Sequence, residues 1–273
     1  DATSHIGVAR DLSAKWDIPL TVPTVTIPEQ VAGQGKNFSI SIEDNQKCRR
    51  YVGVVIKNIQ VSPSPAWLKN RLEAIGLRSI NNIVDVTNYV MYEWGQPLHA
   101  FDADNIKGSS IHVKSFEETY KFTTLDGVIR EVPRGSLFIC DDEQAIAIAG
   151  IMGGENSEVT DSTTTIVLES AYFDPSIIRK CAKQLSLQTD ASYRFERGID
   201  SNIQLTAAIR AADLIKEMNP DALITETIDL HPLPKKTLEL SLRVSRVNQI
   251  LGVDIDEEWI INKLNRLEIT SKR

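Results

Sequence analysis

INNIVDVTNYVMYEWGQPLHAFD, residues 80–102, is the most informative stretch of the chain because it joins a helical pattern to a clear stop signal. Ile83, Val86 and Val90 recur at helical spacing, which predicts an amphipathic helix over residues 82–93. Gly95 and Pro97 then end that helix. The residues that follow, His99 included, are predicted to form a loop.

The flanking sequence predicts a mixture of strands and helices. Before this stretch, residues 51–61 have the β-branched content of a strand, and Ser64 is predicted to cap a short helix that begins at Pro65 and stops at Gly76. After it, strands and two helices are expected at residues 111–113, 137–139, 145–151, 163–168, 175–185 and 201–218. Short strands with glycine turns between helices indicate an α+β fold with a mixed sheet.

The two ends of the chain differ in pattern from the middle. Residues 1–35 are predicted to hold a short helix and then an extended linker with a flexible join at Gly33–Gly35. Residues 231–236, HPLPKK, form a second predicted linker. Residues 238–267 are predicted to be a strand and two helices, too short for a domain with its own core.

Composition excludes several classes of protein. The 273 residues are 42% hydrophobic with a net charge of −7, which fits a globular protein and argues against one that wraps long stretches of phosphate backbone. It leaves room for a pocket that takes one end of a nucleic acid. The three cysteines form no CxxC pair, which argues against a metal knuckle and favours a reducing cytoplasm. The sequence has neither the apolar run of a membrane span nor the leader of a signal peptide.

Individual candidate residues do not identify a function by themselves. The glycine segment AIAGIMGG, residues 147–154, lacks the lysine of a P-loop and favours a tight turn over a close backbone approach to a ligand. His99 has no triad or metal partner at suitable spacing, so a structural role is the commoner alternative. Glu169 follows an apolar run and is either at a solvated strand end or aimed into a pocket.

Several segments, taken together and in order, resemble the β subunit of bacterial phenylalanyl-tRNA synthetases. They are SHIGVARDL, the stretch at residues 76–102, AIAGIMGG, IVLESAYFDPSIIRK and LQTDASYRFERGID. The resemblance implies that residues 1–35 are the end of a preceding domain and a linker. It implies that residues 36–234 are a tRNA-editing domain. Residues 235–273 would begin a following helix-rich domain whose fold resembles a DNA-binding one.

The resemblance also implies an activity: part of a phenylalanine–tRNA ligase that hydrolyses tyrosine wrongly esterified to the phenylalanine tRNA. A mostly apolar synthetic pocket rejects an added hydroxyl poorly, which is why a second site is needed. Carried over, His99, Asn88 and Thr87 would lie near the ester and its water as the catalytic group. The implied substrate-binding residues are Glu169 for the tyrosine hydroxyl, Ala149, Gly150 and Ala191 for the ring, Thr189, and Arg78 for the tRNA terminus.

The implied partners are the 3′ end of the phenylalanine tRNA and a synthetase α subunit in an α2β2 assembly. The implied location is the cytoplasm, and no membrane partner is expected. No metal or cofactor is expected in this fragment. ATP and magnesium are expected only for the whole enzyme, whose synthetic site lies on the other subunit. Two alternatives stay open: a non-catalytic scaffold or RNA-binding module of the same fold, and a free-standing nucleic-acid-binding protein that uses its helical tail.

Overall fold

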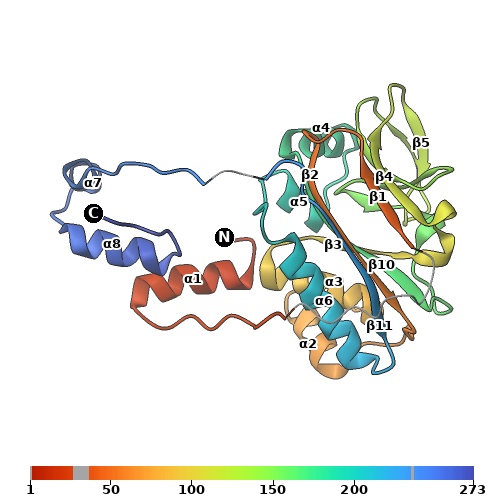
Figure 1. The fold of residues 1–273 in the computed structure, drawn as a ribbon, viewed down its shortest axis with the longest axis horizontal. Helices are drawn as coiled ribbons and strands as arrows, with labels where there is room; N and C mark the ends of the chain where they lie inside the picture. The colour runs from red at the N-terminus through yellow and green to blue at the C-terminus, as the bar shows by residue number, and fades with distance from the viewer. Residues whose placement is uncertain (1, 27–36, 235–236) are drawn as a thin grey trace. The chain divides into compact units, whose positions relative to one another are not determined.

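The computed structural model describes residues 2–26, 37–234 and 237–273, which form two compact units. The larger unit is Val25–Pro234, and the smaller unit combines residues 2–24 with residues 237–273. Figure 1 shows the elements of each.

The larger unit is built on an antiparallel four-stranded sheet with the order β11 (Leu223–Leu230), β2 (Cys48–Lys57), β10 (Thr165–Phe173) and β3 (Leu98–Asp102). Both central strands, β2 and β10, are buried along almost their whole length, because they are apolar on both faces. Side chains alternate between the faces of a strand, so each strand contributes to two cores.

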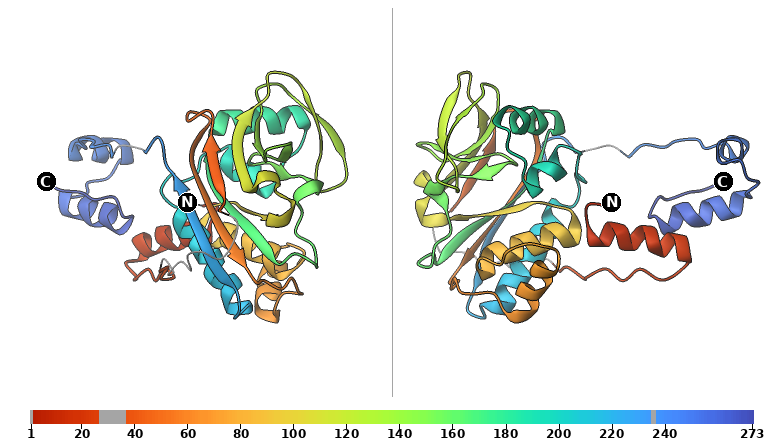
Figure 2. Two further views of the ribbon diagram at one scale, coloured as in Figure 1. Left: turned by 45° about the vertical axis from the view of Figure 1, so that its right-hand side comes forward. Right: turned by 180° about the vertical axis from the view of Figure 1, so that it is seen from behind.

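One face of this sheet is covered by helices α3 (Asn82–Trp94) and α6 (Gln204–Met218), with α2 (Ala66–Ala74) beside α3 (Figure 2). Val52 and Val54 of β2 pack here with the alanine-rich face of α6. Small side chains on α6 permit a close approach of helix to sheet.

The other face packs against a five-stranded mixed sheet with the order β1 (Ser39–Ile42), β4 (Ser110–Ser115), β7 (Leu137–Cys140), β8 (Ala145–Ile148) and β9 (Met152–Gly153). Only the β1–β4 pair is parallel among these pairings. Tyr51 and Val55 of β2 belong to this second core. The larger unit is therefore an α+β fold of helix, sheet and mixed sheet in three layers.

Shorter elements complete the larger unit. They are the hairpin β5 (Tyr120–Thr123) and β6 (Ile129–Val132), the helices α4 (Pro175–Leu185) and α5 (Asp190–Phe195), and single 3₁₀ turns at Ala103–Asn105, Lys107–Ser109 and Glu155–Ser157. Asp174 caps α4 by accepting from the backbone N–H of Ser176, with Pro175 at the first helical position.

The smaller unit consists of α1 (His5–Trp16), α7 (Val244–Leu251) and α8 (Glu257–Arg266). Lys263 of α8 donates to the carbonyl oxygen of Ala14 at 2.7 Å and to the carboxylate of Asp17 at 2.8 Å. Residues 2–24 and 237–273 thus share one compact unit. The division into domains at residues 35 and 235 stays a prediction. Its likeness to a DNA-binding fold stays a prediction. No helix within the described ranges combines the length and apolarity that a bilayer crossing requires.

Four local predictions need correction, and a fifth concerns residues that the structure does not describe. His99 lies on strand β3 instead of in a loop, and Glu169 lies inside β10 instead of at its end. Ser64 does not cap α2, because its hydroxyl donates to Asp85 at 2.6 Å. Residues 237–243 form no strand. The predicted join at Gly33–Gly35 lies outside the described residues.

Candidate functional site

A cavity of about 70 Å³ collects four of the nine predicted site residues. His99 comes from β3, Glu169 from β10, Gly150 from the turn after β8, and Ala191 from α5. These positions are scattered over more than ninety residues of sequence, and strand pairing brings them together. Glu169 is paired directly with His99 across β10 and β3, and residues opposite each other in adjacent strands place their side chains on the same face.

Glu169 is a buried carboxyl group with one hydrogen-bond partner among the residues that the structure describes. Its side chain is only 7% exposed, and the hydroxyl of Tyr51, itself fully buried, donates to Glu169 Oε2 at 2.7 Å. Burial raises the pKa of Glu169 to about 7, although the bond from Tyr51 acts in the opposite direction. Glu169 is therefore close to the balance between its charged and neutral forms at neutral pH.

Tyr51 is a site residue that the sequence analysis missed. It lies on β2 beside β10, and burial followed by the charge of Glu169 raises its pKa well above the usual range, so its hydroxyl remains a donor. A buried tyrosine usually finds a partner for its hydroxyl. That rule could have predicted a hydrogen bond from Tyr51 in its apolar strand, but it could not have predicted that Glu169 is the acceptor.

His99 supplies a neutral imidazole at the cavity wall. Its Nε2 is enclosed and has no hydrogen-bond partner among the described residues. Burial lowers the pKa of His99 to about 4, so the ring is uncharged at neutral pH. A Cβ on Gly153 would lie 2.7 Å from Nε2, so only glycine leaves the ring its place. A neutral histidine with a free nitrogen can hold a water molecule or accept a proton.

The turn at Ala149–Ile151 gives the cavity its floor. Gly150 has a φ of +66°, and a Cβ there would lie 2.9 Å from the ring of Phe195. Ala149 is buried next to it and does not line the cavity. Thr189 caps α5 and donates to the carbonyl oxygen of Ile151 at 3.0 Å, which ties the start of α5 to this turn. Thr189 therefore positions Ala191 instead of lining the cavity.

Three predicted residues lie outside the cavity lining. Thr87 is buried on α3 and donates to the carbonyl oxygen of Val84 at 2.7 Å. Asn88 is half-buried on the same helix, and Arg78 is exposed between α2 and α3. Their roles near the ester and the tRNA terminus stay predictions.

The cavity offers no covalent nucleophile or metal site that the described residues reveal. Burial and the charge of Glu169 raise the pKa of the nearby Cys48 thiol, which keeps it protonated and unreactive. Within the described ranges no group of three or more His, Cys, Asp or Glu side chains gathers as metal ligands. What remains is a buried carboxyl group, a neutral imidazole and a small apolar wall.

Glu169→Gln is expected to gain stability relative to the parent protein as the pH rises. The raised pKa means that the fold favours the neutral carboxyl, so its contribution is present below about pH 4.5 and is lost as the pH passes through 7. Glutamine stays neutral and still accepts from Tyr51. The difference in free energy of unfolding should grow by about 2–3 kcal/mol between pH 5 and pH 8.

Urea denaturation at the two pH values measures this difference. The matched control is Glu131→Gln, on the exposed side of β6. An offset for Glu169→Gln that is the same at both pH values would contradict the burial of the carboxyl group.

Comparison with known proteins places this geometry in a family. Residues 47–220 match the family model of the B3/4 domain. The chain is 48% identical over 255 residues to the phenylalanine–tRNA ligase β subunit of Salinibacter ruber, covering 93% of this chain and 31% of that protein. It is 45% identical over 268 residues to the same subunit of Geobacter metallireducens, covering 98% and 34%.

A solved N-terminal fragment of the phenylalanyl-tRNA synthetase β subunit from Pyrococcus horikoshii aligns with 97% of this chain and 72% of that one, at 13% identity and a TM-score of 0.44. The chain spans about a third of the length of the curated relatives it matches. The chain therefore belongs to the B3/4 domain family, as a fragment of the β-subunit type of phenylalanine–tRNA ligase.

Proposed function

We propose that this chain is the editing part of a phenylalanine–tRNA ligase and hydrolyses tyrosine wrongly esterified to the phenylalanine tRNA. The observation that carries the proposal is the Glu169 carboxyl group, which is buried in the cavity wall with Oε2 bound to Tyr51. Its Oε1 is left to accept from a phenolic hydroxyl. A phenylalanine ring in the same place would leave this polar group without that donor.

The size of the cavity suits one side chain. About 70 Å³ corresponds to roughly five to seven water molecules, which is the scale of a single aromatic ring. Ala191 and Gly150 contribute almost no volume at its wall. The small residues therefore leave space that larger ones would fill.

The reaction is direct attack by water on the ester carbonyl. The bond from the carbonyl carbon to the ribose oxygen breaks, tyrosine leaves as the free acid, and the tRNA regains its hydroxyl. His99 Nε2 holds the attacking water, and the neutral imidazole or the ribose hydroxyl takes its proton. The proposed reaction has no acyl-enzyme, because the described residues that line the cavity include no serine, threonine or cysteine.

Deacylation tests the proposal directly. The full-length protein, assembled with its synthetase α subunit, is expected to release tyrosine from tyrosyl-tRNA much faster than phenylalanine from phenylalanyl-tRNA. ATP, magnesium and the synthetic site belong to the rest of that cytoplasmic enzyme in this proposal. Equal rates for the two esters, at the level of spontaneous hydrolysis, would contradict it.

A second candidate is a non-catalytic RNA-binding module of the same fold. The observation in its favour is that Thr87, Asn88 and Arg78 do not line the cavity. Under this alternative the protein binds the tRNA end and leaves both esters intact. The same deacylation assay, combined with a measurement of tRNA binding, separates the two.

A further inference from the structure

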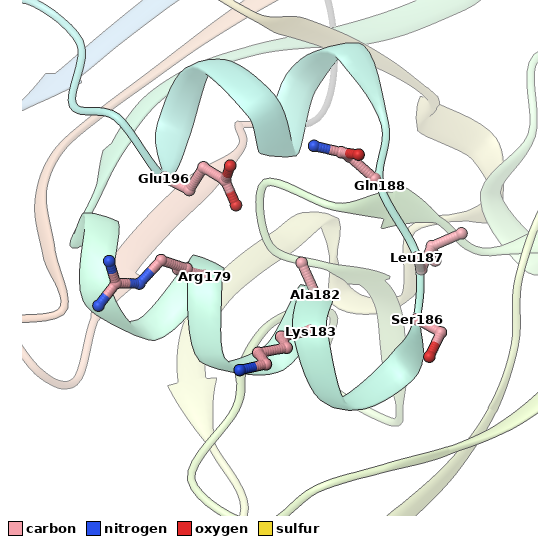
Figure 3. Close-up of a pocket in the computed structure, with 7 residues that line it drawn as sticks. All are labelled: Arg179, Ala182, Lys183, Ser186, Leu187, Gln188 and Glu196. Atoms are coloured by element: carbon pink, nitrogen blue, oxygen red, sulfur yellow. The ribbon is translucent and has the colours of Figure 1, made fainter.

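A second and larger hollow lies on helix α4, next to the cavity that holds His99 and Glu169. Its volume is about 410 Å³, and Figure 3 shows the side chains of Arg179 and Lys183 on α4, with Gln188 and Glu196 across the space from them. Leu187 adds an apolar part to the wall. We call this hollow the α4 cleft.

The α4 cleft lies in a locally cationic part of an acidic chain. Residues 175–198 hold five basic residues (Arg179, Lys180, Lys183, Arg194, Arg197) against two acidic ones (Asp190, Glu196), a balance of +3 in a chain of −7. Neither Arg179 nor Lys183 forms an ion pair with a described residue. The one carboxylate of the cleft, Glu196, is already paired with Arg197 at 2.5 Å. The charge that remains uncompensated in the cleft is therefore positive.

Helix α4 lines the α4 cleft, helix α5 lines the cavity that holds Glu169, and the two helices pack against each other. Ala191 and Phe195 of α5 line the cavity, whereas Gln188 and Glu196, which flank α5, line the cleft. From α4, Ile178 lies 3.2 Å from the position that a Cβ on Gly150 would take. A chain whose end enters the cavity needs to extend only past one short helix to meet the cleft.

We propose that the α4 cleft binds backbone phosphates of the single-stranded RNA end whose terminal ester enters the cavity. This proposal rests on the proposed function. Arg179 and Lys183 pair with phosphate oxygens, and Leu187 packs against a sugar or base. Phosphate contacts fix the position of a strand without reading its sequence, which is what an editing site needs from the common end of its tRNA. Because the chain as a whole is acidic, it repels phosphates elsewhere and favours their binding at this cationic cleft.

The test compares two double variants of the full-length assembled protein. Arg179→Glu with Lys183→Glu is expected to lower kcat/KM for tyrosyl-tRNA at least tenfold. It should also make the fall of log(kcat/KM) with log salt shallower by about 1.4, since each single-strand phosphate contact contributes about 0.7. Lys69→Glu with Lys121→Glu, at exposed positions on α2 and β5, makes the same change of net charge and should have little effect.

A phosphate-free substrate separates binding from damage to the fold. Tyrosyl adenosine, with the ester on its ribose, should be hydrolysed equally by the two double variants. Equal losses on tyrosyl-tRNA for both doubles, or a loss on tyrosyl adenosine confined to the cleft variant, would overturn the proposal. If the parent protein hydrolyses neither ester, the proposed function fails, and binding of a fluorescent single-stranded RNA with the acceptor-end sequence then decides the cleft alone. Unchanged affinity in the cleft variant would refute it.

Discussion

Replacing Glu169 by alanine is expected to lower the hydrolysis of tyrosyl-tRNA by roughly tenfold to a hundredfold, since a hydrogen bond to a charged acceptor contributes about 1.5–3 kcal/mol. Hydrolysis of phenylalanyl-tRNA should stay level or rise slightly. Alanine removes the bond that favours tyrosine and also the buried polar group that phenylalanine leaves without a donor. The quantity to measure is the ratio of the two deacylation rates in the assembled synthetase.

Tyr51→Phe is the control for this result. It keeps the carboxyl group and the shape of the core, but it removes the hydroxyl that donates to Glu169 Oε2. Its discrimination ratio should fall between those of the parent and Glu169→Ala. If Glu169→Ala lowers both rates equally, Glu169 serves the chemistry or the fold and does not read the hydroxyl. If neither rate changes, Glu169 lies outside the site.

Ala191→Trp is expected to abolish hydrolysis of tyrosyl-tRNA, with a loss of a hundredfold or more, while the protein stays folded. Ala191 is half-buried at the wall of a cavity of about 70 Å³, and an indole would take the space of the substrate ring. The first turn of α5 is held by Thr189 through its bonds to Ser192 and Ile151, so the backbone has support independent of Ala191.

The matched control is Ala191→Ser, which stays small and should retain most of the activity. Both variants should show the same thermal unfolding temperature to within a few degrees. A soluble Ala191→Trp protein that clears tyrosyl-tRNA at the parent rate would remove Ala191 from the binding site.

Local pattern predicted the helices of the larger unit well. The apolar spacing of Ile83, Val86 and Val90 gave α3, and Asp174–Pro175 gave the start of α4. Strand β3 was missed because its sequence, LHAFD, is short and contains a histidine. It also follows Gly95 and Pro97, which are typical of a loop. The end of β10 was placed too early because Glu169 interrupts an apolar run.

The candidate site was within reach only through the family resemblance. Cavity residues such as His99 and Glu169 meet because β3 and β10 pair in one register, and a single sequence carries no record of which strands pair. Tyr51 was missed for the same reason, since its partner comes from another strand. Thr87 and Asn88 lie on α3 outside the cavity lining, and their roles near the ester stay predictions.

The smaller unit joins helices from the two ends of the chain, which constrains the order in which the elements can pack during synthesis. Asp17 of α1 and Lys263 of α8 are separated by 246 residues, and a ribosome that adds 5–20 residues per second takes roughly 12–50 s to make that span. Through this interval α8 has not yet been synthesised, so α1, whose Ile6 and Ala14 are buried in the folded protein, lacks that packing partner. The sheets of Val25–Pro234 are synthesised in this interval, so α1 packs against α8 only after those sheets have been made.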